Sequence, residues 1–323
     1  MARPKILITR RWPKPVEKHL AERYDVTLNE TDQPFETSEI RDAMTRFDAV
    51  CPTVSDRIGA DVFKVTDLRT KILGNYGVGF SHIDVAACKR LGVVVTNTPD
   101  VLTECTADLA IMLMLMVARR AGEGERQLRS RSWTGWRPTH MLGTKVSGKT
   151  LGLIGFGRIG QATAVRGHHG FGMRILYHSR KRAAPEVEAA TGATYAPSLD
   201  DLIRESDFIS LHCPGGAETR HLLNTERLAK MKKTAFLINT ARGEVVDEGT
   251  LIEALKHNRI AGAGLDVYER EPDVPNALIA LNNVVLLPHL GSATAETRIA
   301  MGMRVAQNLD AFFDGKPPPD RVV

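Results

Sequence analysis

The sequence predicts an α/β protein in which two doubly wound parallel sheets form separate domains. Three observations lead to this fold class. Short β-rich segments alternate with helical segments over residues 5–97, and the alternation restarts at residue 150. One long helical segment, 103–131, lies between the two series. Because parallel strands need helical crossovers, such alternation is typical of parallel sheets covered by helices on both faces.

The first series begins with residues 5–9, a run of Lys-Ile-Leu-Ile-Thr with the aliphatic character of a strand. The helix after it is predicted from the helical spacing of Val16, Leu20 and Tyr24. Strands are expected at 5–9, 26–28, 49–53, 71–74 and 93–97, and helices at 15–24, 38–46, 60–65 and 85–91.

Residues 103–131 are expected to form a single linker helix, apolar through 109–117 and charged through 119–131. This pattern predicts burial at one end and, at the other, exposure or contact with a partner chain, so we expect a homodimer. The longest apolar run, 109–118, is half of the roughly 20 residues that span a bilayer. The sequence therefore does not predict a membrane protein.

The second series closes with a helix at 295–313, where Ile299, Met303, Leu309 and Phe313 follow helical spacing. Its strands are expected at 150–154, 174–178, 208–213, 235–239, 261–266 and 283–288, and its other helices at 160–168, 186–190, 199–205, 225–231 and 248–257.

Composition excludes several classes of protein. The 43 basic and 38 acidic residues leave a net charge of +5. The densest basic run, 180–182, is too short for a nucleic-acid-binding tail. The four cysteines form no CxxC pair and no metal-ligand spacing, so we expect reduced thiols, no metal site and a cytoplasmic location. The N-terminus carries no cleavable signal pattern.

A glycine motif follows the first strand of the second series. Residues 155–160 match GxGxxG between an apolar strand and a helix, which is the context that a Rossmann-type dinucleotide site requires. The helix N-terminus offers free N–H groups and a partial positive charge to phosphates. A packing loop without a ligand is the alternative. The expected cofactor contacts here are Gly155, Phe156, Gly157, Arg158, Ile159 and Gly160.

The end of the next strand bears on which dinucleotide is bound. NAD enzymes usually carry an acidic residue there for the ribose 2′-hydroxyl, but this chain has Ser179, Arg180, Lys181 and Arg182. A hydroxyl and guanidinium groups suit a 2′-phosphate. We therefore expect NADPH to be preferred, with NADH still possible; a solvated basic loop is the alternative.

Three later blocks each place polar residues just after an apolar strand: 238–243, 265–272 and 287–294. In an open parallel sheet those strand ends face the ligand crevice, as the glycine loop does. Arg242, a glutamate and His289 together suggest hydride transfer with a proton relay. An ordinary surface ion network is the alternative.

These blocks, the glycine loop and residues 75–79 together resemble the D-isomer-specific 2-hydroxyacid dehydrogenases over nearly the whole chain. The basic strand end and the stretch from Trp133 to Trp136 are most similar to the glyoxylate/hydroxypyruvate reductases, including those that reduce 2-ketogluconate. The resemblance implies two Rossmann-like domains, with the cofactor domain, 103–288, inserted into a substrate domain of 1–102 and 289–323.

The resemblance also implies roles for individual residues. Arg242 would clamp a small 2-oxo acid, and His289 would donate the proton in reduction to the 2-hydroxy acid. Glu271 would hold the other imidazole nitrogen, with Glu269 as the rival carboxylate. Substrate contacts are implied for Tyr76, Val78, Gly79, Arg242 and His289, and further cofactor contacts for Thr106, Pro214, Thr219, Thr240, Ala241, Asp266 and Gly291.

The sequence is also compatible with other roles for some residues and with other functions for the protein. Trp136 is equally compatible with plain packing and with a place beside a partner subunit's site. His178 and His212 end strands near the expected cofactor site without an assigned role. Alternatives for the whole protein are a D-lactate, phosphite or 2-ketogluconate enzyme of the same family, or a dinucleotide-sensing protein like the family's corepressors.

Overall fold

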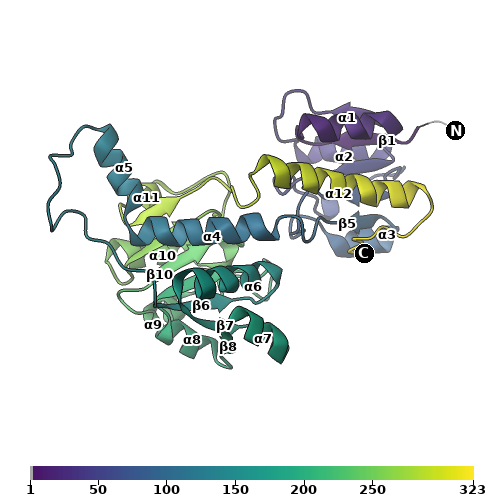
Figure 1. Cartoon of the computed structure of the whole chain (residues 1–323). Helices are drawn as coiled ribbons and strands as arrows, with labels where there is room; N and C mark the ends of the chain where they lie inside the picture. Colours follow the sequence, from purple (N-terminus) through teal and green to yellow (C-terminus); the bar gives the residue numbers. More distant parts are fainter. Residues whose placement is uncertain (1–2) are drawn as a thin grey trace. The chain divides into compact units, whose positions relative to one another are not determined.

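The computed structural model describes residues 3–323, which fold into two α/β units (Figure 1). The first unit contains Met1–Leu102 and Ala293–Val323, and the second contains Thr103–Ser292. In sequence, the second unit is therefore an insertion in the first. The chain returns to the first unit at Ala293 rather than at the expected residue 289.

The first unit is a five-stranded parallel sheet with the order β2-β1-β3-β4-β5. Helices α2 and α3 and the short helix η1 share one apolar core with the sheet, and α1 and α12 pack on each other, with α12 also against β4. The strands are β1 (Lys5–Ile8), β2 (Asp25–Leu28), β3 (Ala49–Cys51), β4 (Ile72–Gly74) and β5 (Val94–Thr96). The helices are α1 (Lys14–Arg23), α2 (Thr37–Arg46), η1 (Ala60–Phe63), α3 (Val85–Leu91) and α12 (Ala295–Phe313).

Burial on both faces explains why these strands are apolar throughout. Ile6 and Ile8 of β1 are 0% exposed and Leu7, which points to the opposite face, is 5% exposed. On β4, a Cβ at Gly74 would lie 2.8 Å from a methyl carbon of Val305. The last helix is therefore packed directly against β4.

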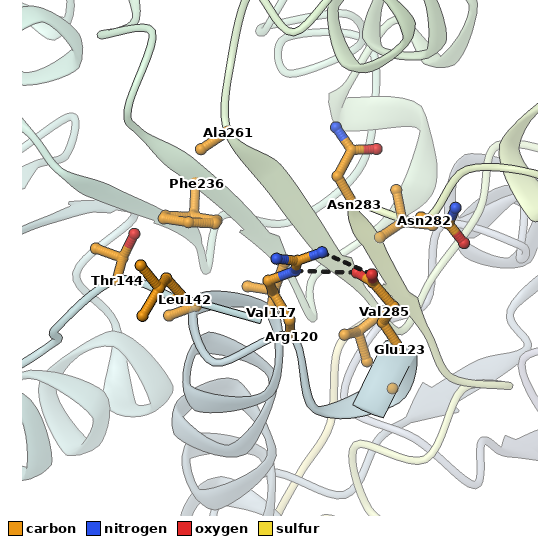
Figure 2. A pocket seen from close by; sticks show the side chains of 14 residues that line it. Val117, Arg120, Glu123, Leu142, Thr144, Phe236, Ala261, Asn282, Asn283 and Val285 are labelled. Carbon is orange, nitrogen blue, oxygen red and sulfur yellow. Dashed lines mark hydrogen bonds and ion pairs between the residues drawn. The ribbon is translucent and has the colours of Figure 1, made fainter. Parts of the chain in front are cut away.

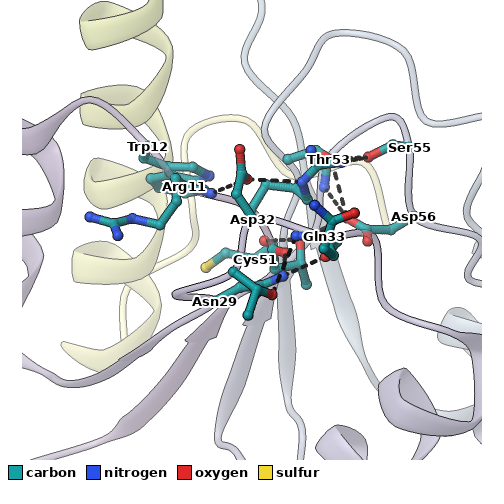
Figure 3. Close-up of polar contacts among 12 residues, drawn as sticks. Arg11, Trp12, Asn29, Asp32, Gln33, Cys51, Thr53, Ser55 and Asp56 are labelled. Atoms are coloured by element: carbon teal, nitrogen blue, oxygen red, sulfur yellow. Dashed lines mark hydrogen bonds and ion pairs between the residues drawn. The ribbon is translucent and has the colours of Figure 1, made fainter.

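Polar side chains form a network where β1 and β3 end (Figure 3). Asp56 is 1% exposed and accepts hydrogen bonds from the Thr9 hydroxyl at 2.6 Å and from the Thr53 N–H at 2.7 Å. Asp32 accepts the Arg11 N–H at 2.8 Å. These bonds satisfy backbone groups of the loops that leave the sheet at its carboxyl edge.

The second unit is a seven-stranded parallel sheet with the order β12-β11-β10-β9-β6-β7-β8. One apolar core joins the sheet to α8, α9 and α10, and a second core on its other face joins it to α4 and α6. The strands are β6 (Thr150–Ile154), β7 (Arg174–His178), β8 (Ala193–Tyr195), β9 (Phe208–Leu211), β10 (Phe236–Asn239), β11 (Gly262–Leu265) and β12 (Val284–Leu286). The helices are α4 (Thr103–Ala118), α5 (Ala121–Arg129), α6 (Arg158–Val165), η2 (Arg166–Gly170), α7 (Pro185–Thr191), α8 (Leu199–Glu205), α9 (Thr225–Lys230), η3 (Gly243–Val245), α10 (Glu248–Lys256) and α11 (Asn276–Ile279).

The expectation of a single helix over 103–131 is wrong in one respect. The helix ends at Ala118, and Arg120 takes a left-handed backbone with φ of 55° before α5 begins. The loop at 143–144 docks at this break, where the Thr144 N–H bonds the Ala118 carbonyl at 2.7 Å. Glycines at 122 and 124 further weaken a continuous helix.

Within residues 3–323, no helix has the length and apolar character needed to cross a bilayer. The same residues contain no group of three or more His, Cys, Asp or Glu side chains placed to hold a metal ion. All four cysteines are free thiols.

Candidate active site

The glycine loop connects β6, in the interior of the seven-stranded sheet, to α6. Gly155 has φ of +93°, and a Cβ there would lie 2.6 Å from the backbone nitrogen of Cys213. A Cβ at Gly160 would lie 2.5 Å from the carbonyl oxygen of Gly155. Glycine is therefore required at both positions for the loop, α6 and the end of β9 to pack together.

Gly157 serves a different purpose, because nothing lies within 4 Å of the place that its Cβ would occupy. It caps the N-terminus of α6, where Arg158 and Ile159 form the first turn. Phe156 is buried and stacks on Tyr177 with ring centroids 3.9 Å apart. Open space beside the N–H groups of a helix start fits the pyrophosphate of a dinucleotide.

The basic residues that follow β7 make different contacts. Arg182 donates two bonds to Glu188, at 2.9 and 2.8 Å, and Glu188 also accepts the Tyr177 hydroxyl at 2.5 Å. These two partners lower the pKa of Glu188 to about 2. Arg182 therefore braces α7 against the sheet.

Ser179 and Arg180 lie at the tip of this turn. The Ser179 hydroxyl donates to the Lys181 carbonyl at 2.6 Å. Arg180 pairs with Glu218, at 3.1 Å, and the two side chains are 84% and 79% exposed. An ion pair so exposed is weak, so Glu218 does not hold the guanidinium of Arg180 firmly in place.

A buried hydroxyl without a partner lies at the end of β10. Thr240 is 9% exposed, and its Oγ1 makes no hydrogen bond in the part of the chain that the structure describes. Beyond β9, the Thr219 hydroxyl bonds the carbonyl of exposed Pro214 at 2.6 Å. Together with the open space at Gly157, the unsatisfied Thr240 hydroxyl shows that the residues present fit a bound dinucleotide.

Arg242 extends from a tightly built turn after β10. The Asn239 side chain accepts the Ala241 N–H at 3.0 Å and donates to the Arg242 carbonyl at 3.0 Å. Burial lowers the pKa of Arg242, and the charges of Glu271 and Glu244 oppose that effect. Among residues 3–323, no carboxylate lies within ion-pairing distance of this guanidinium, whose Nη1 bonds the Ala241 carbonyl at 2.6 Å.

His289 and Glu271 form a hydrogen-bonded pair after the two neighbouring strands. The His289 Nδ1 lies 2.7 Å from Glu271 Oε2, and the side chains are 30% and 34% exposed. Burial alone would raise the pKa of Glu271, but the bond and the charge of His289 and the Tyr268 N–H hold it below its usual value. The rival carboxylate, Glu269, bonds His221 instead, at 2.9 Å.

Asp266 organises the loop that carries His289. It is 1% exposed, and its two oxygens accept the Leu290 N–H at 2.6 Å and the Gly291 N–H at 2.8 Å. The Thr106 hydroxyl bonds the Gly291 carbonyl at 3.0 Å. Burial raises the pKa of Asp266, and the two N–H groups oppose that effect.

Arg242, Glu271 and His289 thus follow β10, β11 and β12, which are neighbours in the sheet. The charge of Glu271 acts on both Arg242 and His289. The second unit therefore places a cation, a carboxylate and an imidazole together at the edge from which the glycine loop also leaves. This arrangement can bind an anionic carbonyl compound and exchange a proton with it.

The predicted substrate loop, 76–79, belongs to the first unit. Tyr76 is 5% exposed, packs against Trp12 with the two rings tilted by 45°, and bonds the Arg298 carbonyl at 2.5 Å, so its side chain braces the loop. Asn75 holds the carbonyls of Gly77 and Gly79. The N–H groups of Val78 and Gly79 have no acceptor in the described chain, which suits them to bind a carboxylate.

Several bracing residues were not predicted from the sequence, among them Asn75, Asn239 and Glu244. Asn239 ends an apolar strand and directly precedes the block with Arg242, and this position is the signal that was available. His178 and His212 bond the Ala196 carbonyl at 2.8 Å and the Ser210 hydroxyl at 2.9 Å. Both histidines therefore have partners within the protein.

A cavity of about 390 Å³ lies where β10, β11 and β12 begin, beside the junction of α4 and α5 (Figure 2). Its wall includes Phe236, Val285 and the ion pair of Arg120 with Glu123 at 2.6 Å. The candidate active site is at the opposite, carboxyl ends of the same strands. This cavity is therefore not part of the site.

Comparison with known proteins gives consistent results. Residues 111–291 match the family described as D-isomer specific 2-hydroxyacid dehydrogenase, NAD binding domain. The glyoxylate reductases of Thermococcus onnurineus and Aeropyrum pernix are each 48% identical, over 99% and 100% of this chain and 96% of each relative.

Among solved structures, the NADPH-dependent glyoxylate/hydroxypyruvate reductase of Sinorhizobium meliloti, in complex with NADP and malonate, superposes with a TM-score of 0.88. It is 36% identical, over 100% of this chain and 97% of the other.

Proposed function

Because this chain belongs to the D-isomer-specific 2-hydroxyacid dehydrogenase family of NAD(P)-dependent oxidoreductases, we propose that it reduces glyoxylate and hydroxypyruvate with NADPH as the preferred hydride donor. The observation that carries the proposal is the meeting of Arg242, Glu271 and His289 at one strand edge, in the unit that holds the glycine loop.

Arg242 is the proposed substrate clamp. Its planar fork of N–H donors matches the carboxylate and carbonyl oxygens of a 2-oxo acid. Its guanidinium has no carboxylate partner within ion-pairing distance in residues 3–323. Because the surroundings also lower its pKa by burial, an anionic substrate gains more from this charge than it would from one in open solvent.

His289 is the proposed proton donor. Bound NADPH supplies the hydride to the carbonyl carbon. His289 gives the proton to the carbonyl oxygen from Nε2, since Nδ1 is engaged by Glu271. The carboxylate of Glu271 fixes the orientation of the ring through its bond to Nδ1. In the oxidation of a 2-hydroxy acid, His289 acts as the base.

For the substrate carboxylate we also propose the N–H groups of Val78 and Gly79. Two side chains of the first unit support this proposal: Asn75 and Asn97 hold the carbonyl groups of the loop by hydrogen bonds. This arrangement leaves the two amides free to donate to a ligand. Cofactor contacts are proposed for the glycine loop, for Ser179 and Arg180, and for the unpartnered Thr240 hydroxyl.

The proposal is tested by mixing the protein with NADPH and glyoxylate and following the absorbance of NADPH. A panel of glyoxylate, hydroxypyruvate, pyruvate, phenylpyruvate and 2-ketogluconate ranks the substrates by kcat/KM. We expect the first two to rank highest. Turnover of none of the five, together with association of the protein that depends on NADPH, would instead support a dinucleotide sensor.

The preference for NADPH is tested at Arg180. We expect Arg180→Ala to lower kcat/KM with NADPH by about tenfold or more, the value of one charged contact to a phosphate, and to leave NADH nearly unaffected. Arg182→Ala is the matched control, because Arg182 is engaged by Glu188. Equal loss with both coenzymes in Arg180→Ala would contradict a 2′-phosphate contact.

We further propose a homodimer and a cytoplasmic location. The dimer is supported by four large apolar side chains that are exposed between α5 and β6 or on α5 itself: Leu128, Trp133, Trp136 and Leu142, at 62%, 51%, 81% and 68%. The location is supported by the four free thiols.

A further inference from the structure

One short segment of the second unit, residues 269–271, contributes the glutamates of two histidine–glutamate pairs. Glu271 bonds His289 and Glu269 bonds His221, at 2.7 and 2.9 Å. Both histidines have left-handed backbones, with φ of 57° and 48°. Such a conformation is unfavourable for residues other than glycine and is kept where surrounding contacts impose it. The reaction proposed above uses only the first pair.

The second pair belongs to a network that fastens the loop after β9, residues 214–223. Glu269 Oε1 accepts from Arg220 as well as from His221, each at 2.9 Å. Glu244 accepts the Gly216 N–H at 2.8 Å through its side chain and the His221 N–H at 2.8 Å through its carbonyl. The loop is thus tied to the turns after β10 and β11 by side chains from both.

The loop at 214–223 packs against the side chain of Arg242, the proposed substrate-binding residue. A Cβ at Gly215 would lie 3.0 Å from Cγ of Arg242 and 2.4 Å from Glu244 Oε1. On the other side, a Cβ at Gly243 would lie 1.9 Å from the carbonyl carbon of Tyr268. The stem of Arg242 therefore lies against the loop, and the backbone directly after Arg242 packs on the segment that carries both glutamates.

We propose that Glu269 and His221, together with Glu244, are positioning residues for Arg242. This inference rests on the proposed function, since it assigns them to the orientation of the clamp in oxo-acid reduction. Glu269 fixes the loop through Arg220 and His221, and the loop fixes the rotamer of Arg242. A displacement of about 1 Å in a substrate-orienting group is enough to cost up to a hundredfold in rate. Activity should therefore respond to this network far more than stability does.

Glu269→Gln and His221→Asn test the proposal. Glutamine keeps the size of Glu269 without its charge. Asparagine accepts the left-handed backbone of residue 221 but is too short to reach Glu269. In each variant we expect KM for glyoxylate to rise about tenfold, kcat to fall less, and the NADPH Kd to stay within about twofold, because the glycine loop is untouched. The thermal midpoint should barely change.

Glu253→Gln is the matched control. Glu253 forms a histidine–glutamate pair with His257 on α10, at 3.2 Å, with side chains 55% and 54% exposed. We expect its kinetics to match the wild type. Unchanged KM in Glu269→Gln and His221→Asn, or an equal change in the control, would overturn the positioning role. A loss of activity that parallels a loss of thermal stability in both variants would do the same.

A structural readout separates this inference from the proposed function. The amides of Gly216, His221 and Leu223 bond Glu244 and Val245, so hydrogen exchange over residues 214–223 reports on the loop without any substrate. We expect faster exchange there in Glu269→Gln than in Glu253→Gln. If the wild type fails to reduce glyoxylate, the proposed function fails, yet this comparison still tests the network. Equal exchange in the two variants would show that Glu269 does not fasten the loop.

Discussion

His289 is the residue in which backbone and side chain are both specialised. Its φ of 57° lies in the left-handed region, and its N–H bonds the Asp266 carbonyl at 2.9 Å. The carboxylate of Asp266 holds the next two amides. The surrounding bonds therefore impose a conformation that a histidine rarely adopts, and this conformation points the imidazole at Glu271.

The backbone of His289 decides which substitution tests its chemistry. Asparagine tolerates the left-handed region better than alanine does, so His289→Asn removes the imidazole with the least strain. We expect kcat for glyoxylate to fall by about 10²- to 10⁴-fold, the usual contribution of a general acid. The NADPH Kd, measured by fluorescence, should be unchanged.

The same assay on Glu271→Gln gives the comparison. This variant keeps the imidazole but loses the carboxylate that orients it through Nδ1, so we expect a smaller fall in kcat than for His289→Asn. Wild-type turnover in His289→Asn would remove the histidine from the reaction.

At the residue scale, the candidate site residues were easier to pick out from the sequence than the residues that support them. Arg242, Glu271 and His289 stand out in the sequence because each follows an apolar strand. The bond between His289 and Glu271, rather than Glu269, was expected only from the family's pattern. What Asp266 and Asn239 do depends on which amides lie opposite their side chains. Which amides lie opposite a side chain is decided by the fold and cannot be derived from single positions in the sequence.

The glycine loop and α6 form an element in which similar glycines have separable roles. Gly155 has positive φ and lies against the backbone of residues 212 and 213. Gly157 has an ordinary φ of −76° and open space beside it. The first is needed to fold the loop, and the second leaves room for a ligand.

Alanine substitutions distinguish these roles. We expect Gly155→Ala to destabilise the protein by more than about 2 kcal/mol, because it adds strain at positive φ to a backbone clash. Gly157→Ala should change the free energy of unfolding by no more than about 0.5 kcal/mol and raise the NADPH Kd more than about tenfold, as a methyl group fills the space for the pyrophosphate. Urea unfolding and NADPH titration measure the two effects. An unaltered NADPH Kd in Gly157→Ala would place the dinucleotide elsewhere.

His212, behind the glycine loop, makes stability depend on pH. Burial lowers its pKa to about 4, whereas an unfolded histidine has a pKa of about 6.5. Between those values the unfolded chain binds a proton that the folded chain does not. The contribution of His212 to the free energy of unfolding is fully present above about pH 6.5 and is lost as the pH falls toward 4.

We expect the free energy of unfolding to fall by about 1 kcal/mol from pH 7.5 to 5.5 through this group, a figure reduced for its partial exposure. Urea unfolding of wild type and His212→Gln at the two pH values measures the difference. The substitution should remove this part of the pH dependence, whereas His257→Gln, on the exposed end of α10, should retain it. Identical pH dependence in wild type and His212→Gln would show that His212 is not held neutral.

At the element scale, apolar segments were predicted well even where the strand is short, and two short elements were missed. The strands of the second sheet are recognisable because burial on both faces makes them continuously apolar, as in β9 and β10. The three-residue strand β8 and the four-residue helix α11 were missed. Such short elements depend on a neighbour, β7 for β8, rather than on their own propensity.

For the whole molecule, the order of elements predicted the architecture of each unit. Both sheets are parallel throughout, as alternating strands and helices require. The break between α4 and α5 was not predictable from helical spacing, because it depends on a loop more than twenty residues away in sequence that bonds Ala118. The break matters, since it defines the segment from α5 to residue 145 that exposes the large apolar side chains.

The proposed homodimer can be tested on that segment. Leu128 and Trp133 are 62% and 51% exposed, and apolar side chains so placed usually become buried against a partner. We expect light scattering during size exclusion to give twice the 35.5 kDa of one chain. The double variant Leu128→Glu/Trp133→Glu should elute as a monomer, because an interface does not accept unpaired charges without cost.

Leu91→Glu is the control, since Leu91 is 48% exposed on α3 in the other unit, and it should leave the measured mass unchanged. Each variant should keep the wild-type thermal midpoint at low protein concentration, which separates lost association from lost folding. A wild-type protein of 35.5 kDa at micromolar concentration, or a double variant of unaltered mass, would assign these apolar side chains to a surface other than a dimer interface.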